Sequence, residues 1–242
     1  MSSPATTALA EEAAILNSEL ALLDAAASVA LVASRYRGRI ALVSSFGVEA
    51  AVLLHLVAQA DPAMPVIFLD TGKLFPETLA YRDRLTAHLG LRDLRSLQPD
   101  PAALAAADPL GGLWSFAPDA CCALRKVAPL AAAIAPFHVT LNGRKRAHGG
   151  DRAALPLAEA NEDGRLKVNP LAAWDATAIA AWRAAHRLPP HPLERQGFTS
   201  IGCRPCTSQV VPGEAPRAGR WRGTGKTECG IHTTPHYKKR FQ

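Results

Sequence analysis

Five cysteines are the side chains in this sequence with the most chemistry to offer, and they fall into three groups. Cys121 and Cys122 are adjacent, Cys203 and Cys206 form a CxxC pair, and Cys229 stands alone near the end. Adjacent thiols close a strained disulfide ring, and they fit poorly as two ligands of one tetrahedral ion. Because a cubane distributes its ligands over four irons, the first four cysteines favour a [4Fe–4S] cluster, with a structural zinc site as the alternative.

The fifth cysteine, Cys229 in "KTECGIH", lies among positive charges. Positive neighbours stabilise a thiolate over a thiol, and the adjacent Gly230 leaves the sulfur accessible. We therefore predict that Cys229 is a reactive nucleophile, and an unreactive exposed cysteine is the alternative. The basic neighbours are Lys226, His232 and, upstream, Arg217, Arg220 and Arg222.

The bulk composition is that of a globular protein with a basic surface. The 242 residues are 48% hydrophobic and 20% charged, and the formal net charge is +6. The charge fits a nucleic-acid partner, a small polyanionic substrate or a basic surface of no special function. No stretch approaches the roughly 18 apolar residues of a membrane span, and no basic leader is visible. We therefore expect no membrane association and a cytoplasmic location.

Apolar runs that alternate with helical patterns predict a parallel sheet wrapped by helices. In such a sheet, ligands bind beyond the carboxyl ends of the strands. The predicted strands are "RIALVSS" (39–45), "MPVIFLD" (64–70), "LRDLRSL" (91–97) and "FHVTLNG" (137–143), followed by a hairpin over 154–171 that turns at Asp163-Gly164. The predicted helices span 8–36, 48–60, 76–90, 101–107, 121–134 and 175–188.

From Pro189 onward the sequence is rich in Pro, Gly and Arg and shows no periodicity. A structureless segment of this length is unusual unless it has a function. We expect residues 1–206 to form one α/β nucleotide-binding domain that includes the first four cysteines. Residues 207–242 are expected to form a flexible tail that carries Cys229.

Seven blocks, in order along most of the chain, resemble the assimilatory sulfonucleotide reductases, which reduce adenylyl-sulfate (APS) or phosphoadenylyl-sulfate (PAPS). The blocks are "SSFGVE" (44–49), "LDTGKLFPET" (69–78), "CCALRKVAPL" (121–130), "KVNPLAAW" (167–174), "QGFTSIGCRPCT" (196–207), "GEAPRAGRW" (213–221) and "KTECGIH" (226–232).

The resemblance implies an adenine-nucleotide α-hydrolase-like fold, with a parallel sheet flanked by helices and an irregular C-terminal tail. It also implies one [4Fe–4S] cluster per chain, held by Cys121, Cys122, Cys203 and Cys206. Members with this cysteine set mostly use APS, so APS is the expected substrate in sulfate assimilation and cysteine biosynthesis, and PAPS is the alternative. In the implied reaction Cys229 takes the sulfo group from APS, AMP leaves, and thioredoxin or a glutaredoxin-like donor releases sulfite.

The substrate contacts implied by the resemblance lie in loops that follow strands and in the basic tail. "SSFGVEA" lacks the Gly-Gly loop with downstream Asp and Ser of the ATP pyrophosphatases, which argues for binding an activated nucleotide rather than cleaving ATP. The implied substrate-binding residues are Ser44, Ser45, Phe46, Gly47, Glu49, Asp70, Thr71, Gly72, Lys73, Lys126, Lys145, Arg146, Arg152, Arg217, Arg220 and His232.

Two places depart from the family's pattern. Lys73 stands where relatives usually carry Arg, which keeps the charge but loses bidentate geometry. In "NGRKRAHGGDR" (142–152), relatives typically show Arg-Arg, an acidic residue and then Gln-Ser, whereas this chain has Lys-Arg, Ala147 and then His148-Gly149. The individual contacts of this loop are therefore open.

A nucleic-acid-binding module built on a four-cysteine metal site is the alternative from another class. It would use "RAGRWR" and "HYKKR" as a basic footprint, but it leaves "TECGIH" and "LDTG" unexplained. We therefore expect no nucleic-acid partner. These motifs are compatible with a homo-oligomer and do not fix the oligomeric state.

Overall fold

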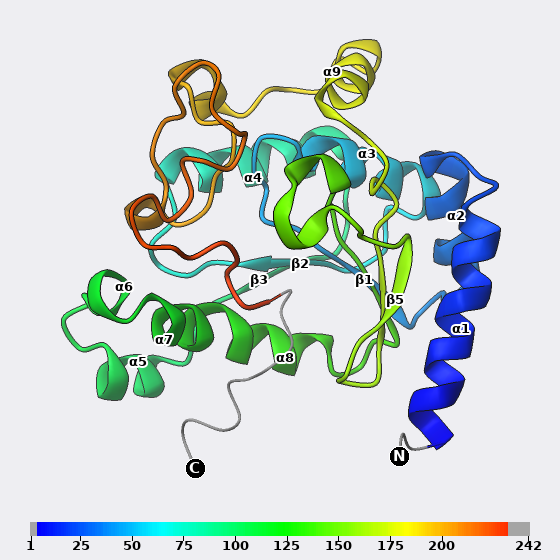
Figure 1. The fold of residues 1–242 in the computed structure, drawn as a ribbon, viewed down its shortest axis with the longest axis horizontal. Coiled ribbons are helices and arrows are strands. Elements are labelled where there is room, and N and C mark those ends of the chain that lie inside the picture. The colour runs from blue at the N-terminus through cyan, green and yellow to red at the C-terminus, as the bar shows by residue number, and fades with distance from the viewer. Residues whose placement is uncertain (1–3, 232–242) are drawn as a thin grey trace.

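A six-stranded sheet forms the centre of the fold in the computed structural model, which describes residues 4–231 (Figure 1). The strand order is β3-β2-β1-β4-β6-β5, and every neighbouring pair is parallel except β5 with β6. This confirms the predicted parallel sheet, with the predicted hairpin supplying the one antiparallel pair. The strands are β1 (Ile40–Val43), β2 (Val66–Leu69), β3 (Leu94–Leu97), β4 (Val139–Leu141), β5 (Ala158–Ala160) and β6 (Leu166–Val168).

Helices cover both faces of the sheet (Figure 1). Helices α3 and α4 lie on one face and α8 on the other, while α1 runs along β5 at the sheet edge. Helices α2 and α9 pack on α3. The helices are α1 (Pro4–Leu20), α2 (Ala25–Arg35), α3 (Ala50–Ala60), α4 (Pro76–Leu89), α5 (Pro101–Ala107), α6 (Leu113–Phe116), α7 (Pro118–Cys122), α8 (Ala128–Ile134) and α9 (Ala176–Ala185).

The prediction of one helix over residues 8–36 is wrong, because α1 ends at Leu20 and α2 begins at Ala25. Asp24 has an extended backbone, and its carboxylate accepts a hydrogen bond of 2.8 Å from the backbone N–H of Ala27. Such an N-cap satisfies a free N–H of a new helix. A second helix therefore starts at Ala25, although the apolar pattern of the sequence continues through this point without a break.

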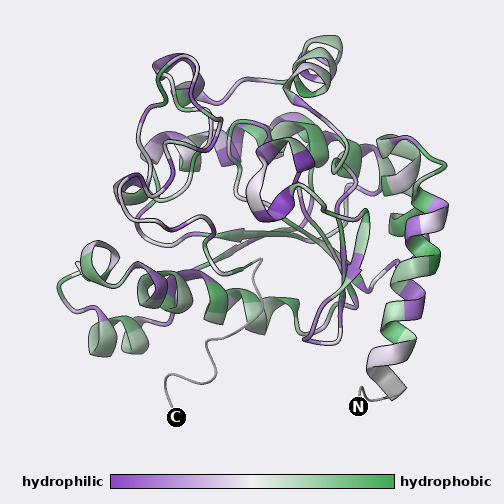
Figure 2. Cartoon of the chain, viewed as in Figure 1, coloured by the Kyte–Doolittle hydropathy of each residue, from purple (hydrophilic) through white to green (hydrophobic). Residues whose placement is uncertain are grey.

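The other predicted elements are present, with short shifts at their ends, and α6 was not predicted. Gly90 ends α4 in the left-handed conformation (φ 65°), and Asp175 caps α9 by accepting a hydrogen bond from the N–H of Ala178. The strands that line the core are strongly apolar (Figure 2). Within the described residues, no helix is long and apolar enough to cross a membrane.

The described part of the C-terminal segment, 207–231, folds back on the CxxC region rather than continuing outward (Figure 1). Thr207 and Arg220 form an isolated antiparallel bridge, and the N–H of Trp221 donates to the carbonyl of Cys206 at 3.0 Å. The predicted division into a domain and a flexible tail stays a prediction.

Candidate active site

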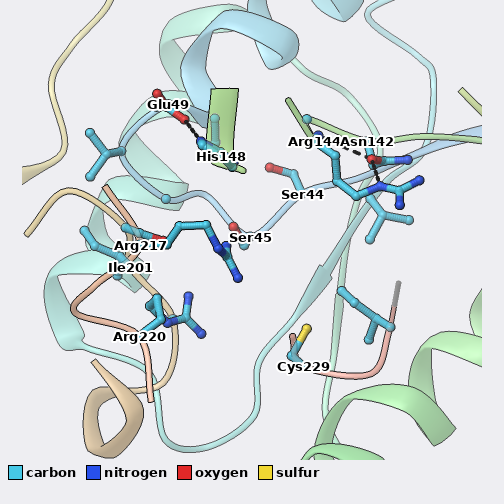
Figure 3. A pocket seen from close by; sticks show the side chains of 18 of the residues that line it. Ser44, Ser45, Glu49, Asn142, Arg144, His148, Ile201, Arg217, Arg220 and Cys229 are labelled. Carbon is cyan, nitrogen blue, oxygen red and sulfur yellow. Dashed lines mark hydrogen bonds and ion pairs between the residues drawn. The ribbon is translucent and has the colours of Figure 1, made fainter. Parts of the chain in front are cut away.

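The main cavity, of about 210 Å³, lies at the carboxyl ends of the central strands (Figure 3). Ser44 follows β1, Thr71 follows β2 and Asn142 follows β4, and all three line it. Because β2 and β4 pair with β1 on opposite sides, the chain crosses over in both directions here. In α/β sheets such a switch point forms the ligand crevice.

The loop after β1 is shaped by Phe46. This residue has a left-handed backbone (φ 48°), is fully buried, and packs edge-on against Phe68 with ring centroids 5.4 Å apart. Its N–H donates to the Ser44 hydroxyl at 3.3 Å. Phe46 therefore lies in the core and not in the cavity lining, while Ser44, Ser45 and Gly47 face the cavity. A non-glycine residue held in this conformation marks a loop fixed by its surroundings.

Glu49 joins this loop to the basic loop after β4. Its Oε2 lies 2.8 Å from Lys145 Nζ and 3.0 Å from His148 Nε2. Burial would raise the pKa of Glu49, but the hydrogen bond from His148 and the charge of Lys145 lower it to about 2. The carboxylate is thus ionised, and Lys145 is held by a counter-charge inside the cavity wall.

Besides Phe46, four of the expected substrate-binding residues in the described part of the chain lie outside the main cavity lining: Asp70, Gly72, Lys73 and Arg146. Asp70 accepts a hydrogen bond from the N–H of Gly72 at 3.0 Å and so forms the turn after β2. Lys73 lines a second cavity, and Arg146 donates from Nε to the carbonyl of Leu155 at 2.8 Å. His232 lies outside the described residues.

Cys229 lines the main cavity, and its sulfur lies opposite two arginines of the C-terminal segment (Figure 3). The Arg220 guanidinium packs over the Trp221 ring at 4.3 Å from its centroid. It also lies so close to Gly202 that a Cβ there would overlap it. Both Arg220 and Lys126 interact electrostatically with Cys229. Burial alone would lower the pKa of Lys126, but attraction to Cys203, Cys229 and Cys122 raises it, so the ammonium stays charged.

The cavity residues that did not emerge from the sequence as functional candidates include Asn142, Arg144 and Glu228. The Asn142 side-chain oxygen accepts from Arg144 Nε at 3.0 Å, and Arg144 also pairs with Glu159. Asn142 directly follows β4 and Arg144 lies two residues further on, at the edge where ligands bind, so their position was the available signal. No such signal identifies Glu228.

The remaining four cysteines line one small second cavity, together with Lys73 and Lys126. All are free thiols. The Cys203 sulfur lies 3.2 Å from the hydroxyl of Thr71, which faces the main cavity. Burial raises the pKa of Cys122 to about 11. In the described part of the chain, no three His, Cys, Asp or Glu side chains surround a point where a single metal ion could sit.

A π-helical turn places the tandem cysteines and Lys126. Helix α7 begins at Pro118 and ends at Cys122, the π turn spans Ala123–Val127, and α8 follows. Pro129 has no N–H to donate to the carbonyl of Arg125 four residues earlier, which favours a wider turn at this point. Lys126 lies in this turn and lines both cavities.

The sheet order, the switch-point cavity and the loops around it define an α/β protein of the adenine-nucleotide α-hydrolase-like class. More particularly, the family model of the phosphoadenosine phosphosulfate reductase domain matches residues 39–209, and the chain belongs to this family. This confirms the resemblance seen in the sequence.

Curated relatives match over most of their length. The adenosine 5'-phosphosulfate reductase of Mesorhizobium japonicum is 52% identical over 81% of this chain and 77% of its own. The protein of the same name from a Chelativorans species is 47% identical over 91% of both chains. A phosphoadenosine 5'-phosphosulfate reductase of Gloeobacter violaceus is 39% identical over 80% of this chain and 82% of its own.

Solved structures support the fold assignment. The phosphoadenylyl-sulfate reductase of Candida auris, in a phosphate complex, has a TM-score of 0.69 at 26% identity, over 83% of this chain and 97% of that one. Yeast FAD synthetase in complex with FAD has a TM-score of 0.53 at 18% identity, over 83% of this chain and 75% of that one, which shows a shared fold alone.

Proposed function

We propose that this chain reduces APS to sulfite and AMP in sulfate assimilation and cysteine biosynthesis. The observation that carries the proposal is the position of Cys229 in a switch-point cavity, where Lys126 and Arg220 interact with it electrostatically. A thiolate that attacks an anionic sulfo group needs such neighbouring cations. The relatives at 52% and 47% identity are both named APS reductases, which favours APS over the PAPS alternative, and the relative named a PAPS reductase is less similar, at 39% identity.

The proposed reaction has two displacement steps. In the first, the Cys229 thiolate attacks the terminal sulfur of APS, and the sulfur–oxygen bond to the phosphate breaks. AMP leaves with the bonding electrons, and Cys229 becomes an S-sulfonate. Lys126 and Arg220 would neutralise the charge that builds up between these anions.

In the second step, an external dithiol supplies the two electrons. A thiolate of thioredoxin, or of a glutaredoxin-like donor, attacks the Cys229 sulfur, and sulfite leaves with the electron pair. The second thiol of the donor attacks the mixed disulfide and restores the Cys229 thiolate. The donor is thereby oxidised to a disulfide, and the sulfo sulfur is reduced to sulfite.

We further propose that Cys121, Cys122, Cys203 and Cys206 hold one [4Fe–4S] cluster. The four thiols line one cavity with Lys73, Arg125 and Lys126, and cations suit a thiolate-ligated anionic cluster. Because each thiolate would bind a different iron, the four sulfurs need not surround a single point. When bound, the cluster would tune the electrostatic field at Lys126, while the electrons come from the dithiol.

Anaerobic purification followed by a sulfite assay tests this function. We expect sulfite from APS with reduced thioredoxin, and a much lower rate from PAPS at the same limiting concentration. A protein that releases no sulfite from either nucleotide, with thioredoxin or glutaredoxin, contradicts the proposal.

A further inference from the structure

Glu228, the residue before Cys229, is held by two arginines. Its carboxylate accepts two hydrogen bonds from Arg152, 2.6 Å from Nε and 2.9 Å from Nη2, and lies 3.5 Å from Arg217 Nη2. The Arg152 and Glu228 side chains are only 10% and 11% exposed. A bidentate pair at this depth fixes both partners in position.

Arg152 is itself oriented by the basic loop. Its Nη1 donates to Nδ1 of His148 at 3.2 Å, and Nε2 of the same ring faces Glu49 at 3.0 Å. Burial would raise the pKa of Glu228, but the hydrogen bond from Arg152 and the charges of Arg152, Arg217 and Arg144 lower it. A chain of polar contacts therefore runs from the loop after β1 to the residue next to the nucleophile.

The cations of the cavity fall into two groups by their partners. Arg152 and Arg217 are paired with Glu228, Lys145 with Glu49, and Arg144 with Glu159. Lys126 and Arg220 form no ion pair with a carboxylate anywhere in residues 4–231. A phosphosulfate group carries two negative charges, which the two cations without a carboxylate partner can balance.

We propose that Glu228 is a positioning residue whose pair with Arg152 docks residues 226–231 and so holds Cys229 in the cavity. In this assignment Arg152 binds the protein's own carboxylate, and Lys126 and Arg220 are available for the phosphosulfate of APS. The assignment rests on the proposed function for the identity of the substrate. It revises the role that family resemblance implies for Arg152.

Docking matters because the attacking sulfur must stay within reach of the sulfo group for the displacement to be fast. The segment before Glu228 has few other anchors: Lys226 pairs with Asp119, and Arg217 donates to the carbonyl of Thr227 at 2.9 Å. Without the Glu228 carboxylate, Cys229 should spend less time in the cavity, while the substrate's own contacts remain.

The first test is the single-turnover rate of Cys229 S-sulfonation by APS, followed by mass spectrometry of the tail peptide. We expect Glu228→Gln to lower the rate at saturating APS about ten- to a hundredfold, with the half-saturating APS concentration unchanged within about twofold. Glu228→Asp keeps the charge and should restore part of the rate. A higher half-saturating concentration with an unchanged limiting rate would assign the arginines to the substrate and overturn the proposal.

Glu194→Gln is the matched control, since Glu194 forms a similar bidentate pair with Arg183, at 2.7 and 2.8 Å, outside the cavity lining. It should leave the S-sulfonation rate unchanged. The double variant Glu228→Gln/Arg152→Gln should be about as slow as either single variant, because both remove one contact. Effects that multiply would show that Arg152 acts on the substrate independently, which contradicts the proposal.

A second test does not depend on the reaction. Trypsin should cleave after Lys226 at least about tenfold faster in Arg152→Gln than in the wild type, because release of the segment opens the peptide bond to the protease. This variant leaves the tail sequence unchanged, and Arg183→Gln is its control. Unchanged cleavage overturns the docking role even if APS is reduced, whereas faster cleavage supports it even if the wild type releases no sulfite.

Discussion

The hydroxyl of Thr71 lies 3.2 Å from the sulfur of Cys203, and this contact joins the two cavities. Thr71 lines the main cavity, and Cys203 lines the second cavity, which contains the four cysteines. The backbone supports the contact, because Leu74 and Cys203 form an antiparallel bridge and the N–H of Arg204 donates to the carbonyl of Lys73 at 2.8 Å. The loop after β2 therefore connects the proposed cluster ligands to the proposed substrate site.

Cys203→Ser should bleach the visible absorption of the anaerobically purified protein and lower its iron content, because the serine hydroxyl is a poor substitute for a thiolate ligand. Sulfite production should fall as well. Thr71→Val is the control, since it removes the hydroxyl contact and keeps all four thiols, so iron should be retained. Wild-type protein that contains zinc, and neither iron nor labile sulfide, would refute the cluster assignment.

Cys229→Ser should abolish sulfite release from APS while the iron content and visible absorption stay at the wild-type level. Cys229 lines the main cavity and is absent from the lining of the second cavity, so replacing its thiol removes the nucleophile and leaves the four proposed cluster ligands in place. The measurements are a sulfite assay and iron analysis on the same preparation. Substantial residual turnover would show that another group attacks the sulfo sulfur.

Gly202→Ala should impair the reaction more than the fold. A Cβ at Gly202 would overlap the Arg220 guanidinium, and this end of a long side chain can move away without disturbing the backbone. We expect kcat/KM for APS to fall about tenfold and the free energy of unfolding to change by less than about 1 kcal/mol. Gly112→Ala is the control, because its Cβ would meet nothing closer than 4.0 Å, so it should leave kcat/KM unchanged. A large loss of stability in Gly202→Ala would contradict this account.

The sheet and the cavity could be predicted because their signals are local. Apolar runs between helical patterns predicted β1 to β4, and the Asp163-Gly164 turn predicted the hairpin of β5 and β6. Ser44 and Thr71 lie in motifs at the ends of predicted strands, and the family resemblance implies them as substrate contacts. Such positions are defined by neighbours in the sequence.

The contacts that set the role of each charge could not be predicted, because they join distant residues. Arg152 and Glu228 are 76 positions apart, and only the folded chain brings them together. The basic residues of the loop after β4 looked equivalent in the sequence, yet Lys145 faces Glu49 while Arg146 reaches the carbonyl of Leu155. The widened turn after Cys122 was also missed, since it shares the helical pattern on both sides.

Asp108→Asn should destabilise the protein, because it leaves the buried Arg125 guanidinium without its counter-charge. The Asp108 and Arg125 side chains are 3% and 8% exposed, and their ion pair measures 2.7 Å. Breaking such a pair costs about 3 kcal/mol or more in the free energy of unfolding. Asp93→Asn, which breaks an exposed pair with Arg95, should cost less than about 1 kcal/mol in the same denaturation assay. Equal losses for the two variants would contradict the importance of burial here.

Lys167 should make the stability depend on pH between about 8 and 10.5. It lies on β6, is 8% exposed, and forms no ion pair within the described residues. Burial, helped by the charge of Arg144, lowers its pKa from 10.5 to about 8. As the pH falls from 10.5 to 8, the unfolded chain binds a proton at Lys167 that the folded chain does not, so the free energy of unfolding decreases. The free energy of unfolding should therefore rise by on the order of 2 kcal/mol when the pH is raised through this window.

In Lys167→Met this rise in the free energy of unfolding should disappear, and the variant should be more stable than the wild type near pH 7.5. Parallel pH profiles of the two proteins in chemical denaturation would show that Lys167 is charged at its site without cost.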